Sequence, residues 1–244
     1  MRRLPIVTLS TIAVWTAGGL WLDGQVDRTG QLALGVLTVC VLGGLLAFHT
    51  PVVRLQTLGV VVFATLGEVV GSLVWGLYDY RLENLPAYVP PGHGLIYLAG
   101  FSLATLSGSR PRRLLRAAAL GAAVWGIAGL TVLPAADVAG AIGCAFLLLV
   151  LFTTRRPVYA GVFLVVAGLE LYGTALGTWT WASDVPGLGL SQGNPPSGVA
   201  SGYVVFDVLA LSLAARLSSL ASSLGEVRGR AQSISARIAA RSIG

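Results

Sequence analysis

The chain has 244 residues, of which 55% are hydrophobic and only 11% are charged, and its mean hydropathy is +0.80. Soluble domains carry about 25% charged residues, so this chain has too few to cover a water-facing surface. The composition therefore predicts a protein folded in lipid. The net charge is +6, and every basic residue is arginine. Because the arginines lie between apolar runs, we expect them to set membrane topology and expect no nucleic-acid partner.

Eight apolar runs approach the roughly 20 residues that a membrane-spanning helix needs. They lie near residues 4–22, 31–49, 57–78, 93–108, 116–133, 137–153, 157–178 and 199–221. The first run resembles a signal peptide, but it lacks a small-x-small cleavage site and is followed at once by another run. We interpret it as a retained helix. The sequence thus predicts an all-α, polytopic membrane protein with about eight transmembrane helices.

The arginines are distributed unevenly between the two sides that eight spans would create. Fourteen fall on one side, and only Arg28 and Arg81 fall on the other. The fourteen are Arg2, Arg3, Arg54, Arg110, Arg112, Arg113, Arg116, Arg155, Arg156, Arg216, Arg228, Arg230, Arg237 and Arg241. The excess of arginine on cytoplasmic loops predicts a plasma-membrane protein with both termini in the cytoplasm.

The C-terminal segment 222–244 is too polar to be a span. Apolar residues recur at helical spacing from Leu224 to Ile238, with arginines between them. This pattern indicates a basic amphipathic helix on the inner leaflet, and a solvated tail is the alternative.

Motifs recur in the same order in the two halves of the chain, at offsets of roughly 100 to 110 residues. Each half has an Ala-Val-Trp motif followed by Gly-Leu, a cysteine, a Pro-Val pair, a Glu-x-x-Gly motif and a Pro-Pro pair. The matched positions are 13–20 with 123–130, Cys40 with Cys144, Pro51 with Pro157, Glu68 with Glu170, and Pro90 with Pro195. We predict two tandem four-helix repeats, 1–110 and 111–221. An even number of spans in each orients the two repeats alike, about an axis along the membrane normal.

Three carboxyl groups lie within predicted spans: Glu68, Glu170 and Asp207. Ionisable groups are costly in a membrane, so we expect these three to be catalytic acid or base groups. Glycines and aromatics follow each glutamate at helical spacing and predict one helical face in each half. Those faces are Glu68, Gly71, Trp75 and Tyr78 in the first half, and Glu170, Gly173, Gly177 and Trp181 in the second. Protonated struts across the repeat interface are the structural alternative.

Aromatic residues and one histidine complete the candidate substrate-binding set. These residues are Trp75, Tyr78, His93, Tyr97, Trp179, Trp181 and Tyr203. We expect one central cavity in the outer half of the membrane, capped by the proline-rich loops 79–92 and 182–198. The tryptophans could instead form an interfacial belt, and His93 could be a solvated cap.

Several chemistries have no motif here. The chain lacks a Walker A loop and the GxSxG, HExxH and CxxC motifs. One histidine near three carboxyls gives thin support for a mixed metal site. We therefore expect neither a metal nor a cofactor.

The motif around Glu68 resembles that of a known enzyme group. The stretch Glu68-x-x-Gly71…Trp75-Gly76-x-Tyr78-x-Tyr80…Pro86 is similar to the signature of carotenoid-biosynthesis membrane hydratases of the bacterioruberin type, with a shorter gap before the aromatic cluster. Chain size, span count, a glutamate in span 3 and an aspartate in the last span resemble small membrane-bound terpene cyclases. The resemblance implies an acid that protonates an alkene or epoxide of an isoprenoid. It implies Glu68 as the acid, Asp207 as a cation-stabilising carboxylate and Glu170 as a second acid.

The residues themselves favour the same chemistry. A carboxyl in a low-dielectric cavity is disfavoured as an anion and stays protonated, and aromatic faces stabilise carbocations. The leading hypothesis is a membrane-embedded lyase or isomerase that cyclises or hydrates an apolar isoprenoid or lipid dissolved among membrane lipids. The alternatives are a proton-coupled carrier or exporter and a non-catalytic scaffold.

Overall fold

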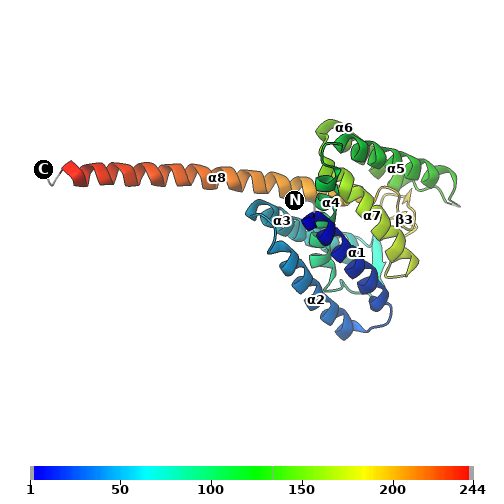
Figure 1. Cartoon of the computed structure of the whole chain (residues 1–244). Helices are drawn as coiled ribbons and strands as arrows, with labels where there is room; N and C mark the ends of the chain where they lie inside the picture. The colour runs from blue at the N-terminus through cyan, green and yellow to red at the C-terminus, as the bar shows by residue number, and fades with distance from the viewer. Residues whose placement is uncertain (1–2, 134, 242–244) are drawn as a thin grey trace.

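The structure, a computed structural model, describes residues 3–133 and 135–241, with side-chain surroundings described as far as residue 220. This part of the chain forms eight α-helices and two small antiparallel sheets (Figure 1). The helices are α1 (Arg3–Asp23), α2 (Arg28–Leu46), α3 (Pro51–Glu68), α4 (Val89–Ser107), α5 (Pro111–Thr131), α6 (Val138–Thr154), α7 (Pro157–Ala175) and α8 (Ala200–Arg241). A π-helical turn, η1 (Val69–Val74), extends α3, and the strands are β1 (Tyr78–Tyr80), β2 (Trp179–Trp181), β3 (Asp184–Val185) and β4 (Leu190–Ser191).

Within the described ranges, six helices are long and apolar enough to cross a membrane. They are α1, α2, α3 with η1, α5, α7 and the Ala200–Leu220 part of α8. The chain is therefore a multi-pass α-helical membrane protein. The other two helices of the predicted eight spans differ from these six. Helix α6 is apolar but has only 17 residues, and α4 is not among the six.

Helix α4 lies at the centre of the bundle, where it packs against α1, α2, α3 and α7. Most of its residues are buried, including the run His93–Gly100. A helix surrounded by other helices contacts protein more than lipid and tolerates polar residues and glycine. It crosses α7 so closely that a methyl group on Gly161 would overlap the carbonyl of Gly100. Helix α3 packs in turn against α8.

Helices α3 and α7 end earlier than the sequence predicted. The predicted spans ran to residues 78 and 178, whereas the helical segments end at Val74 and Ala175. Gly76 and Gly177 follow with φ of +73° and +69°, a backbone conformation that side chains disfavour and that ends helices. The prediction of one helical face per half is therefore wrong for Tyr78 and Trp181, which lie on strands.

The two strands that follow these helices pair with each other. Strand β1 is antiparallel to β2, with Tyr78 opposite Trp181 and Tyr80 opposite Trp179. The ladder is extended on both sides, because the Arg81 amide donates to the Thr178 carbonyl and the Ala182 amide donates to the Leu77 carbonyl, each at 3.0 Å. This ribbon joins the end of α3 to the end of α7, and we call that end of the bundle the strand end.

Buried aspartates hold the loops at the strand end. The side chain of Asp23 accepts hydrogen bonds from Gln31 at 2.7 Å and from Arg81 at 3.3 Å. Asp137 caps α6 and accepts from the amides of Gly140, Gly193 and Ser197 at 3.0, 2.8 and 2.6 Å. The loops on either side of the β1–β2 ribbon are thereby fixed to helix ends.

At the opposite end of the bundle, α8 continues beyond the other helices as far as Arg241 (Figure 1). The predicted tail 222–244 is thus helical as far as that residue. Its predicted amphipathic character depends on side chains that lie outside the described residues.

Candidate functional site

Glu68 is the last residue of α3, and its side chain is buried at the strand end. The hydroxyls of Tyr78 and Tyr80 donate to its Oε2 at 2.7 and 2.6 Å. Nε2 of His93, in the second turn of α4, lies 2.8 Å from Oε1. Burial raises the pKa of Tyr78 and Tyr80 above the ordinary 10.0, so both remain protonated donors. Glu68 thus has three hydrogen-bond partners from two elements.

Glu170 occupies the corresponding place on α7 and is 2% exposed. The indole N–H groups of Trp179 and Trp181 donate to its Oε2 at 2.9 and 3.2 Å. The hydroxyl of Tyr203, on α8, donates to Oε1 at 3.3 Å. All three of these donors are neutral, whereas one partner of Glu68 is an imidazole. The two carboxyls therefore each have three hydrogen-bond partners but differ in the chemistry of those partners.

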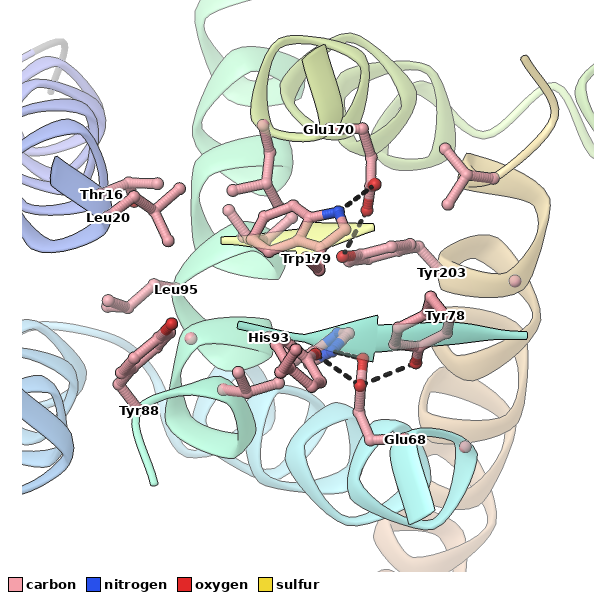
Figure 2. Close-up of a pocket in the computed structure, with 18 of the residues that line it drawn as sticks. Thr16, Leu20, Glu68, Tyr78, Tyr88, His93, Leu95, Glu170, Trp179 and Tyr203 are labelled. Carbon is pink, nitrogen blue, oxygen red and sulfur yellow. Dashed lines mark hydrogen bonds and ion pairs between the residues drawn. The ribbon is translucent and has the colours of Figure 1, made fainter. Parts of the chain in front are cut away.

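Aromatic contacts connect the two carboxyls through the space between them. The rings of Tyr78 and Trp181, on neighbouring strands, have centroids 4.4 Å apart. His93 stacks on Tyr203 with centroids 4.8 Å apart. The His93 ring, which bonds to Glu68, therefore lies against the Tyr203 ring, whose hydroxyl donates to Glu170, as Figure 2 shows.

A cavity of about 230 Å³ lies between these groups. Glu68 and Glu170 lie on opposite sides of it, and Thr16 and Leu20 of α1 line a third side, at the left of Figure 2. Most of its remaining lining is apolar or aromatic. Further lining residues are Trp15, Gly19, Leu34, Thr38, Gly67, Gly71, Leu77, Tyr80, Tyr88, Val89, Gly92, Leu95, Ile96, Leu169, Val199, Gly202 and Phe206. An apolar cavity with a few convergent polar groups is typical of a ligand site.

The structure brings seven of the ten sequence-predicted site residues to this cavity. They are Glu68, Tyr78, His93, Glu170, Trp179, Trp181 and Tyr203. Trp75, Tyr97 and Asp207 are not among the lining residues. The Trp75 side chain is exposed, and its N–H donates to the carbonyl of Pro186 at 2.9 Å.

Asp207 and Tyr97 belong to a second polar group, deeper in the bundle. Asp207 follows Tyr203 by four residues on α8, is 1% exposed, and has no described hydrogen-bond partner for its Oδ2. It lies near the hydroxyls of Tyr97 and Tyr159. Tyr97 donates to Oε1 of Gln56 at 2.9 Å.

Sequence reasoning missed two parts of the site. Tyr80 belongs to the motif that follows Glu68, but only the pairing of β1 with β2 shows that it reaches that carboxyl. The wall from α1 and α2, with Trp15, Gly19 and Thr38, has no motif that signals a site. Among the described residues, no group of three or more His, Cys, Asp or Glu could hold a metal ion.

Comparisons with protein-family models, with curated proteins and with solved structures find no match to this chain.

Proposed function

We propose that this protein is a membrane-embedded acid–base enzyme that cyclises or hydrates an apolar isoprenoid or a similar lipid. One observation carries the proposal: two buried carboxyls face one aromatic cavity in unequal surroundings. Glu170 has only neutral donors, whereas Glu68 has a histidine at 2.8 Å. Carboxyls whose surroundings differ in this way divide into an acid and a base.

Under this proposal Glu170 is the acid, whereas the family resemblance implied Glu68 in that role. Desolvation without a nearby cation favours its protonated form. Its O–H bond breaks as the alkene electron pair forms a new C–H bond, or as an epoxide oxygen takes the proton. The resulting carboxylate is stabilised by the N–H groups of Trp179 and Trp181. The carbocation is stabilised by the aromatic faces that line the cavity.

Glu68 and His93 together are the base. The pair can take a proton from the carbon next to the cation, and loss of this proton forms a new double bond. It can instead take a proton from a water molecule that attacks the cation. The first outcome completes an isomerisation or cyclisation, and the second a hydration. Tyr203 lies between the two groups, hydrogen-bonded to Glu170 and stacked on His93. The pair releases one proton to water and Glu170 takes one up before the next turnover, so the net reaction consumes none.

We also propose eight spans in two four-helix repeats, with both termini in the cytoplasm. Helix α6, at 17 residues, is about 25 Å long, close to the roughly 30 Å hydrocarbon core. Support for the repeat comes from matched packing of equivalent helices. Helix α3 packs against α8 as its counterpart α7 packs against α4, and α2 packs against α4 as its counterpart α6 packs against α8. Gly76 and Gly177 also end equivalent helices. The arginine bias places the strand end outside.

The test is mass spectrometry of lipid and pigment extracts from cells that express the wild type, Glu170→Gln or Glu68→Gln. Both variants should lose the product that depends on the wild-type gene, by about a hundredfold or more, as expected for a removed general acid or base. Glu83→Gln, at an exposed position, is the control. Full product formation by both site variants would refute the mechanism.

A proton-coupled carrier is the second candidate, and Asp207 is the observation that favours it. This buried carboxyl lies outside the cavity lining, next to tyrosines that extend toward the opposite end of the bundle. Buried carboxyls of this kind mark proton routes in transporters. Proton uptake into reconstituted vesicles under an imposed potential, lost in Asp207→Asn, would favour the carrier. Its absence together with a changed lipid extract would favour the enzyme.

A further inference from the structure

The cavity is asymmetric with respect to the two proposed repeats. Helices α1 and α2 contribute Trp15, Thr16, Gly19, Leu20, Leu34 and Thr38. Their proposed counterparts α5 and α6 contribute none. Two equivalent carboxyls thus share a cavity that extends toward the first half of the chain.

One aligned pair of glycines shows why the second half is closed. The proposed repeat aligns Gly19 on α1 with Gly129 on α5. A methyl group on Gly129 would lie 3.1 Å from the Asp137 side chain and 3.2 Å from Ser197, because the capped start of α6 packs there. A methyl group on Gly19 would have nothing within 4 Å. The same position is therefore filled in one half and open in the other.

A surface groove adjoins the cavity at this open position. It is formed by Ser10, Thr11, Val14, Gly18, Leu22 and Val41, together with Trp15 and Gly19, which line the cavity as well. The groove lies on α1 and α2, both of which can cross a membrane, so acyl chains surround it. The Trp15 indole donates to the Thr38 hydroxyl at 3.1 Å and joins the two helices beside the opening.

The size of the cavity limits what it can hold. Sites that enclose drug-sized ligands measure about 300–1,000 Å³, whereas this cavity measures about 230 Å³. A long lipid therefore cannot fit inside completely. Its remaining length must leave through an opening, and the mainly apolar groove shares Trp15 and Gly19 with the cavity.

We infer that the ligand is a chain-shaped lipid that enters sideways from the bilayer at Gly19, with its reactive end between Glu68 and Glu170 and its tail in the α1–α2 groove. This inference rests on the proposed function for the chemistry at the carboxyls. The route itself follows from the shape of the protein.

The experiment uses the full chain in vesicles that contain a phosphatidylcholine with a diazirine at the end of one acyl chain. Irradiation inserts the resulting carbene into nearby C–H bonds, and mass spectrometry locates the labelled residues. We expect labels on Thr16, Leu20 and Leu95 inside the cavity. We also expect labels on Val36, an exposed residue of α2 that reports lipid contact in every sample.

Gly19→Leu is the test variant and Gly44→Leu is its matched control. Both glycines are helical with open space around them, so neither substitution forces a clash. Gly19→Leu should reduce cavity labelling to the background of an unirradiated sample, whereas Gly44→Leu should leave it unchanged. Unlabelled cavity residues in the wild type, or cavity labelling that persists in Gly19→Leu, would overturn the inference.

Labelling requires no catalysis, so this result is separate from the proposed function. Glu170→Gln should retain full cavity labelling while it loses product. Full labelling in a protein with no detectable product would refute the enzyme and leave the route standing. Product formation without cavity labelling would refute the route alone.

Discussion

The contact between Gly173 and Trp179 offers a test of the site that needs no substrate. Trp179 returns from β2 to lie on α7, where its N–H donates to Glu170 at 2.9 Å. A methyl group on Gly173 would come closer than 3.0 Å to three carbons of the indole ring, a separation that real side chains do not adopt. Gly173→Ala must therefore move the ring. Gly168 on the same helix has nothing within 4 Å, so Gly168→Ala is a matched control.

The magnitude follows from three effects. Overpacking of a filled site costs about 1–3 kcal/mol, and loss of a buried hydrogen bond in a membrane protein costs about 0.6 kcal/mol on average. Alanine regains about 1 kcal/mol of helix propensity. Gly173→Ala should therefore destabilise the fold by about 0.5–3 kcal/mol, whereas Gly168→Ala should stabilise it by about 0.5–1 kcal/mol.

Thermal unfolding of the purified protein in detergent measures the difference. A change of 1 kcal/mol shifts the midpoint by about 2–4 °C in a domain of this size, so the two alanine variants should differ by at least about 2 °C. Near-ultraviolet circular dichroism should change in Gly173→Ala as the indole moves. If both variants unfold at the same temperature with unchanged spectra, the packing of Trp179 on α7, and hence its bond to Glu170, is wrong.

Three further predictions concern other parts of the fold. Asp137→Ala should lower the free energy of unfolding by at least about 3 kcal/mol in denaturant titrations, because three amides lose their acceptor; equal stability to Asp184→Ala, at an exposed position, would contradict this. Because the pKa values of Tyr78 and Tyr80 are raised above 10.0 only in the folded state, the contribution of these two tyrosines to stability should be constant up to about pH 10 and fall at higher pH, where only the unfolded chain releases these protons. Unfolding midpoints measured against pH should fall less steeply in Tyr80→Phe, and an unchanged slope would show that Tyr80 does not contribute. Asp207→Asn should keep product formation within about threefold of the wild type, because Asp207 does not line the cavity; a loss as large as that of Glu170→Gln would return Asp207 to the catalytic site.

The candidate site could be predicted in part because its carboxyl groups are easy to identify in the sequence. Glu68, Glu170 and Asp207 are conspicuous in apolar runs, and the aromatic residues close behind the two glutamates point to their partners. Helical periodicity misplaced Tyr78 and Trp181, because it cannot show that Gly76 and Gly177 adopt positive φ and turn the chain into strands. The aspartate and the glutamates look alike in sequence, yet Asp207 lies outside the cavity that both glutamates line.

The multi-pass helical membrane fold follows from the amino-acid sequence alone, because lipid selects long apolar helices by their composition. The sequence also indicated the two buried glutamates, since a charge in a membrane is too costly to be incidental. Three features are visible only in the folded protein: β1 pairs with β2 across the two halves, His93 reaches Glu68, and α1 lines the cavity. These features depend on contacts between segments far apart in the sequence. Such contacts are set by the way helices pack, as the contrast between Gly19 and Gly129 shows.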